Sequence, residues 1–123
     1  MIKGKRKQES SRNLSHAIIK GMEEKKAIDI TILDLRPFQN AIADFFIICS
    51  GNSDTQVEAI MDGIEAEVYK TFNQYPWKTE GTGSREWILV DYVDVVAHVF
   101  LKEKRQRYGL EELWGDAIVE SID

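Results

Sequence analysis

The sequence predicts a single α/β domain in which one mixed sheet of about five strands is flanked by helices. The chain has 123 residues, which is the length of one ordinary domain. Strand-like and helix-like segments alternate along it. The longest apolar segment, residues 87–101, consists mostly of β-branched and aromatic residues, which favour strands over helix. Because this segment is apolar on both alternating faces, we expect both faces to be covered.

A first helix is expected over residues 13–26. Residues 1–12 before it are polar and basic, which predicts a flexible tail. The basic cluster in this tail could make a peripheral contact with RNA, or it could simply be solvated. Apolar residues then recur on one helical stripe, namely Leu14, Ala17, Ile18 and Met22.

Two strands are expected next. Residues 29–35 alternate between polar and apolar with a period of two, and Pro37 ends this strand because proline cannot donate a ladder hydrogen bond. Residues 44–49 are almost continuously apolar, which is typical of a central strand covered on both faces. Cys49 in this strand is most simply a small buried hydrophobe.

A second helix is predicted over residues 54–72. Ser53 at its N-cap and Gln56 three residues later form a capping box. A short strand over residues 77–80 follows a turn that contains proline. The apolar stripe of the helix repeats at steps of three and four residues, through Val57, Ile60, Met61, Ile64 and Val68.

The apolar segment 87–101 is best interpreted as two strands joined by a tight turn at residues 91–94. Strand pairing decides whether the like faces of the two strands coincide. Alternation predicts which side chains share a face within each strand: Trp87, Leu89 and Asp91 in the first, and Val96, His98 and Phe100 in the second.

The remainder of the chain begins with a basic run, residues 102–107. Residues 108–114 carry large side chains at a spacing consistent with one or two turns of helix. The domain is therefore expected to span residues 13–116, with a C-terminal tail over residues 117–123.

The composition excludes several classes of protein. The sequence has no run of eighteen or more apolar residues, so a membrane span is not expected, and its N-terminus lacks the apolar stretch of a secretory signal. A single cysteine rules out an internal disulfide and a Cys-rich zinc site. These features together predict a cytoplasmic protein.

The net charge of −5 is unevenly distributed. Residues 1–26 hold eight Lys or Arg against three Asp or Glu, whereas residues 27–123 hold eight against eighteen. An acidic body would repel phosphate and suits a basic protein partner better than a broad nucleic-acid interface. The alternative is that the acidity only maintains solubility.

The sequence contains no convincing catalytic constellation. The junction Ser50-Gly-Asn-Ser53 between a strand and a helix has the layout of an anion site, but it lacks the lysine and spaced glycines of a phosphate-binding loop. Asp91 and Asp94 could be a metal pair or could cap a tight turn. The only histidines, His16 and His98, lie on different elements. We therefore expect no enzyme, no cofactor and no metal, with a metal-dependent nucleotidyltransferase as the alternative.

Several large aromatic residues remain without an assigned role. Aromatic residues and arginine are enriched at the centres of interfaces, so these side chains could form a partner surface, or they could be core. They lie near the basic run 102–107, and they are Trp87, Tyr92, Phe100, Tyr108 and Trp114.

At this point the sequence resembles a known family. The strings WILVD at 87–91, DVVAHVF at 94–100 and RYGLEELW at 107–114 resemble the ribosomal silencing factor (RsfS) family, also called Iojap-like proteins. Three further strings fit the same pattern: ADFFIICSGNS at 43–53, QVEAI at 56–60 and Glu80-Gly81. The resemblance covers roughly residues 14–116. Val93 departs from it, because many family members carry glycine there.

The resemblance implies a non-enzymatic protein with a nucleotidyltransferase-like fold that lacks the active site. It implies binding to the large ribosomal subunit through ribosomal protein L-fourteen, which sterically blocks the small subunit and represses translation. It also implies a homodimer. An alternative function is a role in assembly of the large subunit, which would use the same binding partner. By motif position, the expected contact residues are Trp87, Asp91, His98, Phe100, Tyr108, Leu110 and Trp114.

Overall fold

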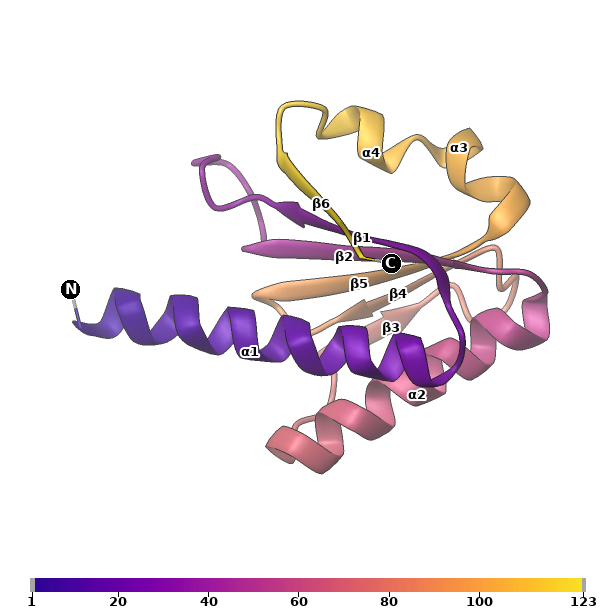
Figure 1. Ribbon diagram of the computed structural model, residues 1–123, viewed down its shortest axis with the longest axis horizontal. Coiled ribbons are helices and arrows are strands. Elements are labelled where there is room, and N and C mark those ends of the chain that lie inside the picture. Colours follow the sequence, from indigo (N-terminus) through magenta and orange to yellow (C-terminus); the bar gives the residue numbers. More distant parts are fainter. Residues whose placement is uncertain (1, 123) are drawn as a thin grey trace.

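The computed structural model describes residues 2–122, with side chains from residue 9 onward. It contains one six-stranded sheet with two long helices on one face and two short helices on the other (Figure 1). The helices are α1 (Ile2–Glu24), α2 (Asp54–Phe72), α3 (Arg105–Tyr108) and α4 (Leu110–Leu113), with a 3-10 turn η1 (Lys102–Lys104). The strands are β1 (Ile28–Asp34), β2 (Phe45–Gly51), β3 (Lys78–Glu80), β4 (Trp87–Asp91), β5 (Val95–Leu101) and β6 (Ile118–Ile122).

The strands lie in the order β3-β4-β5-β2-β1-β6. β2 and β5 run parallel, and the other neighbouring pairs are antiparallel. The predicted α/β class with a mixed sheet is therefore confirmed. Every residue of β2 is buried, which agrees with the central, doubly covered strand expected from its continuous apolar run.

The lower face of the sheet is covered by α1 and α2, which lie side by side beneath it in Figure 1. The two helices approach most closely at Gly21 and Gly63. A Cβ added to Gly21 would lie 2.6 Å from the carbonyl oxygen of Gly63. Only residues without a Cβ permit this approach, so the two glycines set the distance between the helices.

A second, smaller core lies on the upper face. It forms where the segment after β5 folds back over β5, β2 and β1 (Figure 1). Leu110 and Ala117 are the buried hydrophobic residues that this segment adds, and Trp114 packs against the same cluster while half-buried. The upper faces of β3 and β4 are not covered in this way, so Trp87 and Leu89 remain half-exposed.

A flexible tail is expected over residues 1–12, whereas in the structure α1 begins at Ile2, so the backbone from residue 2 is helical. Ser11 is buried, and its hydroxyl donates to Asp44 Oδ2 at 2.6 Å, so this part of α1 is attached to the body. The basic cluster at Lys3–Lys7 belongs to the same helix, but its side chains lie outside the described residues.

The predicted C-terminal tail is also corrected. Residues Ile118–Ile122 form β6, which pairs antiparallel with β1 from Asp34↔Ile118 to Ile30↔Ile122. The physical reason is the free edge of β1, whose backbone groups offer hydrogen bonds to any strand that can reach them. The sheet consequently has six strands where about five were expected.

The predicted capping box of α2 is present in a modified form, because the Gln56 side chain bonds the N–H of Asn52, one residue before the N-cap Ser53. The backbone N–H of Gln56 donates to Ser53 Oγ at 3.1 Å, while Gln56 Oε1 accepts from the N–H of Asn52 at 2.7 Å. The amide of Gln56 also donates to the carbonyls of Lys25 and Lys26, which ties the start of α2 to the end of α1. The polar groups of the junction between β2 and α2 therefore form hydrogen bonds within the chain, and the junction is a capped helix start. Among the described residues, no helix is long and apolar enough to cross a membrane.

Candidate functional site

The pairing of β4 with β5 places the predicted residues of both strands on one face. Trp87 lies opposite Phe100, Leu89 opposite His98, and Asp91 opposite Val96. This face belongs to the upper side of the sheet, away from α1 and α2. Alternation in the sequence could not decide whether the like faces of the two strands lie on the same side of the sheet, and the register shows that they do.

Trp87 is the centre of an aromatic cluster. Its ring stacks on Phe100 with a centroid distance of 5.0 Å, and Tyr108 lies 4.9 Å away on the segment after β5. The indole Nε1–H donates to His98 Nδ1 at 3.0 Å. The cluster is thus fixed by both ring packing and one directed hydrogen bond.

His98 supports this cluster from below. Burial lowers the pKa of its imidazole to about 3, so the ring is neutral near pH 7. Because Nδ1 accepts the tryptophan hydrogen, the ring proton is assigned to Nε2. Phe46 packs against the ring at 4.6 Å, and Nε2 has no hydrogen-bond partner among the described residues. A neutral, enclosed imidazole acts here as a rigid acceptor that orients Trp87.

Burial divides the seven predicted contact residues into two groups. Phe100 is 0% exposed, His98 2% and Leu110 9%, so these three residues present little or no surface to a partner in this conformation and instead support the side chains above them. The other four retain accessible surface: Tyr108 is 42% exposed, and three are half-exposed. These accessible residues are Trp87, Asp91, Tyr108 and Trp114; together with Leu89 they are called the aromatic face below.

Tyr108 is oriented by Glu86. The phenol O–H donates to Glu86 Oε1 at 3.0 Å, and this hydrogen bond is the main reason why the pKa of the phenol is raised above its usual value. Glu86 is itself fixed, because its carbonyl accepts from the N–H of Leu101 at 2.8 Å. The tyrosine ring is therefore held against Trp87 while its edge stays accessible.

Trp114 occupies a different part of the upper face. Its ring meets Phe38 edge-on at 5.5 Å and Phe46 at 6.1 Å, so it closes the upper core beside the loop between β1 and β2. This placement makes Trp114 partly a core residue, which sequence reasoning had considered for the aromatic residues as a group.

The turn between β4 and β5 is built around Val93. The N–H of Asp94 donates to the carbonyl of Tyr92 at 3.0 Å, and Val93 between them has a φ of 75°. This is the geometry of a γ-turn, and a positive φ is strained for a β-branched residue. Asp91 Oδ1 accepts from the N–H of Val93 at 2.7 Å. The carboxylate of Asp91 therefore caps the turn, in agreement with the turn-capping interpretation for this residue.

Sequence reasoning missed an apolar patch at the same end of β4. Ile42, Trp77 and Val93 are 81%, 68% and 54% exposed, and they line one hollow together with Lys78, Asp91 and Val96. Asp91 joins this apolar patch to the aromatic face. Isolated exposed hydrophobic residues are ordinary, but a contiguous group marks a contact surface. The patch could not be found from sequence because its three residues come from three different loops.

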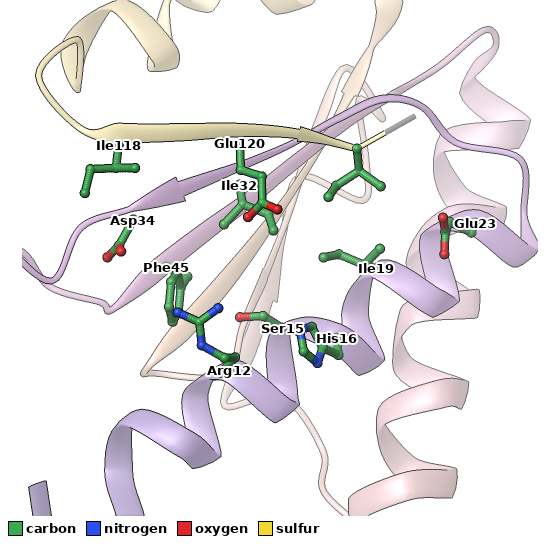
Figure 2. A pocket seen from close by; sticks show the side chains of 11 residues that line it. Arg12, Ser15, His16, Ile19, Glu23, Ile32, Asp34, Phe45, Ile118 and Glu120 are labelled. Carbon is green, nitrogen blue, oxygen red and sulfur yellow. The ribbon is translucent and has the colours of Figure 1, made fainter. Parts of the chain in front are cut away.

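A hollow with a volume of about 550 Å³ lies elsewhere, between α1 and β6 (Figure 2). Ile118 and Glu120 project from β6 toward Arg12 and His16 on α1 (Figure 2). The groove exists because α1 packs beneath β2 and β5 and leaves the outer strand without support. It contains none of the predicted contact residues, and within the described part of the chain no group of three or more His, Cys, Asp or Glu side chains could hold a metal ion.

Comparison with known proteins gives a consistent result. A family model described as "Ribosomal silencing factor during starvation" matches residues 8–123. The ribosomal silencing factor RsfS of Bacillus subtilis is 45% identical over 101 residues, which are 82% of this chain and 84% of that protein. The mouse protein named "Mitochondrial assembly of ribosomal large subunit protein 1" is 31% identical over 76% of this chain and 41% of its own. A crystal structure from Chromobacterium violaceum superposes with a TM-score of 0.79 at 33% identity, covering 85% of each chain.

Proposed function

Because the chain belongs to the ribosomal silencing factor family, we propose that it binds the large ribosomal subunit and lowers translation by preventing the small subunit from joining. The observation that carries this proposal is the aromatic face, which presents Trp87 and Tyr108 on a rigid, buried support. Interface hot spots are enriched in these two residue types when they are held in place by their neighbours.

The contact on the ribosome is proposed to be ribosomal protein L-fourteen. Asp91 joins the aromatic face to the apolar patch and Glu86 lies beside Tyr108, so two acidic side chains border the aromatic surface, while Lys78 lines the apolar patch. Such a combination suits a partner with basic groups around an apolar centre. Once the protein is bound where the two subunits meet, its volume alone excludes the small subunit, and no chemical step is required.

Three further features belong to the same proposal. The basic cluster at residues 3–7 is proposed to contact ribosomal RNA at the periphery of the site, since Lys and Arg neutralise phosphate. The free protein is proposed to be a homodimer that covers the exposed apolar patch, and it is proposed to act in the cytoplasm.

An assembly role on the large subunit is the second candidate function. It is favoured by the mouse relative, whose name refers to assembly of the large ribosomal subunit. This role shares the binding partner, and it differs in predicting no effect on subunit joining.

Direct binding to purified subunits tests the proposal. We expect saturable binding of the fluorescently labelled protein to large subunits and no saturable binding to small subunits. Titration with Mg-ATP or Mg-GTP in a calorimeter should give no saturable heat. Equal binding to both subunits would contradict the proposed site, and saturable nucleotide heat would favour the enzymatic alternative.

A further inference from the structure

Arg105 attaches the segment after β5 to the end of the sheet. Its guanidinium is largely buried, with 11% of the side chain exposed. Nη1 donates to the carbonyl of Asp29 at 2.7 Å and to Ser50 Oγ at 3.0 Å, and Nη2 donates to Thr31 Oγ1 at 3.2 Å. Nε and Nη2 bind the two carboxylate oxygens of Glu111 at 2.9 and 3.2 Å. All five guanidinium hydrogens therefore have an acceptor.

The acceptor side of this arrangement is built into β1. The register of β1 against β2 shifts between Ile28 and Thr31, and Asp29 within this irregularity has a φ of 53°. A bulge turns a carbonyl out of the ladder, and here the carbonyl of Asp29 accepts from Arg105. The left-handed conformation, which aspartate tolerates better than most residues, thus serves the contact with Arg105.

Besides the bonds of Arg105, the segment from residue 102 to residue 116 is held by Tyr108, which contacts Trp87 and Glu86, and by Trp114, which packs on Phe38 and Phe46. Among its described side chains, Leu110 is the one buried hydrophobic residue, with 9% of its surface exposed. Its helices α3 and α4 have four residues each, and helices of this length do not persist without tertiary contacts. The same segment carries Tyr108, one residue of the aromatic face.

We propose that Arg105 is the positioning residue of the partner-binding segment: its hydrogen bonds to β1, β2 and Glu111 hold η1, α3 and α4 on the sheet and thereby keep Tyr108 against Trp87. This inference rests on the proposed function, because it assigns the residue that sets the geometry of the same surface. A lysine cannot replace it, since an ammonium group lacks the planar fork that reaches three elements at once.

Hydrogen–deuterium exchange of Arg105→Lys tests the positioning. Losing the forked hydrogen bonds should raise amide exchange in residues 102–114 by about tenfold, whereas exchange in α2 stays unchanged. Arg107→Lys is the matched control, because Arg107 lies on the same short helix with an exposed side chain. Glu111→Gln, which removes the charge of one acceptor, should give a smaller increase in the same residues and provides a second variant if Arg105→Lys does not fold. Unchanged exchange in residues 102–114 would overturn the inference.

Affinity for large subunits gives the readout that a purely structural role would not change. Arg105→Lys should bind about tenfold more weakly, which corresponds to the loss of about one charge-assisted hydrogen bond. Ile64→Val lowers stability from the opposite core and should leave affinity unchanged. If exchange rises but affinity stays the same, Arg105 has no role in positioning the binding surface. If the wild-type protein does not bind large subunits, the proposed function fails, while the exchange result still decides whether Arg105 holds the segment.

Discussion

The indole Nε1–H of Trp87 donates to Nδ1 of His98, which lies diagonally across the β4–β5 pair, at 3.0 Å. This hydrogen bond connects the most buried part of the upper face with its accessible aromatic surface. Because Nδ1 is the acceptor, the bond requires a neutral imidazole, and burial favours this state by lowering the pKa of His98 to about 3. The orientation of Trp87 is therefore linked to the protonation state of a buried residue.

Stability should fall at acidic pH because of His98. Its folded-state pKa lies below the ordinary value of 6.5, so the unfolded state binds more protons between pH 6.5 and about 3. The contribution of the neutral His98 ring to the free energy of unfolding is complete above pH 6.5. It is lost as the pH falls below that value, by at most about 1.4 kcal/mol per pH unit. Urea denaturation of the wild type and of His98→Gln, which keeps an acceptor but does not titrate, measures this loss as the difference between the two curves. Parallel pH profiles would contradict the assignment.

Val93→Gly should stabilise the protein by about 1 kcal/mol, because glycine adopts a positive φ without the strain that a β-branched residue has there. Thermal and urea unfolding measure the change. Val119→Gly is the matched control: Val119 is similarly exposed but lies in regular strand β6, so the same substitution should destabilise. If Val93→Gly is destabilised, the contradiction is clear: packing of the valine side chain in the apolar patch then adds more to stability than the strained backbone of the turn removes.

Gly21→Ala should destabilise the protein by about 2 kcal/mol, because the added methyl group would meet backbone atoms of α2 and force the helices apart. Gly83 provides the control, since a Cβ there meets nothing within 4 Å, and Gly83→Ala should have no comparable cost. Urea denaturation compares both variants with the wild type. Equal stability of the two variants would mean that the helix crossing adjusts without cost.

Tyr108→Ala should weaken binding to the large subunit by more than about 1 kcal/mol if Tyr108 is a hot spot of the aromatic face. The matched control is Tyr75→Ala, because Tyr75 is even more exposed but packs against Tyr69 on α2, outside the aromatic face. Fluorescence titration with large subunits measures both affinities. A folded Tyr108→Ala protein with wild-type affinity would remove Tyr108 from the contact surface.

The sequence was sufficient to predict the central elements of this fold. The continuous apolar run of β2 and the capping box of α2 are local signals, and both predict structures that are present. Alternation also predicted the shared faces of β4 and β5, and the strand register added that these faces coincide. Local patterns thus specified each element, while long-range pairing decided how the elements meet.

The two chain ends show where sequence reasoning stopped. Residues Ile118–Ile122 include three β-branched residues, which favour a strand, but the segment is short and does not alternate, and it forms β6 because β1 offers a free edge. The polar start of α1 lacks an apolar stripe, yet Ser11 is buried against Asp44. In both places tertiary contacts decide the structure, and a single sequence does not display such contacts.

The candidate site was predictable in its composition but not in its accessibility. Phe100 and Trp87 are both large aromatic residues of the same motif, but the first is fully buried and the second is half-exposed. The difference arises because Phe100 is covered by Trp87 and Tyr108. Which member of a stacked group reaches the surface depends on packing order, and residue type alone does not encode it.

The most direct test of the proposed function is sedimentation of purified ribosomal subunits in a sucrose gradient with this protein. We predict that the protein migrates with large subunits and that the peak of joined ribosomes shrinks, whereas Tyr108→Ala preserves more of that peak. If the protein comigrates with large subunits but joining is unaffected, the assembly role replaces the silencing role. If the protein stays at the top of the gradient and the joined peak is unchanged, the proposed silencing function is contradicted.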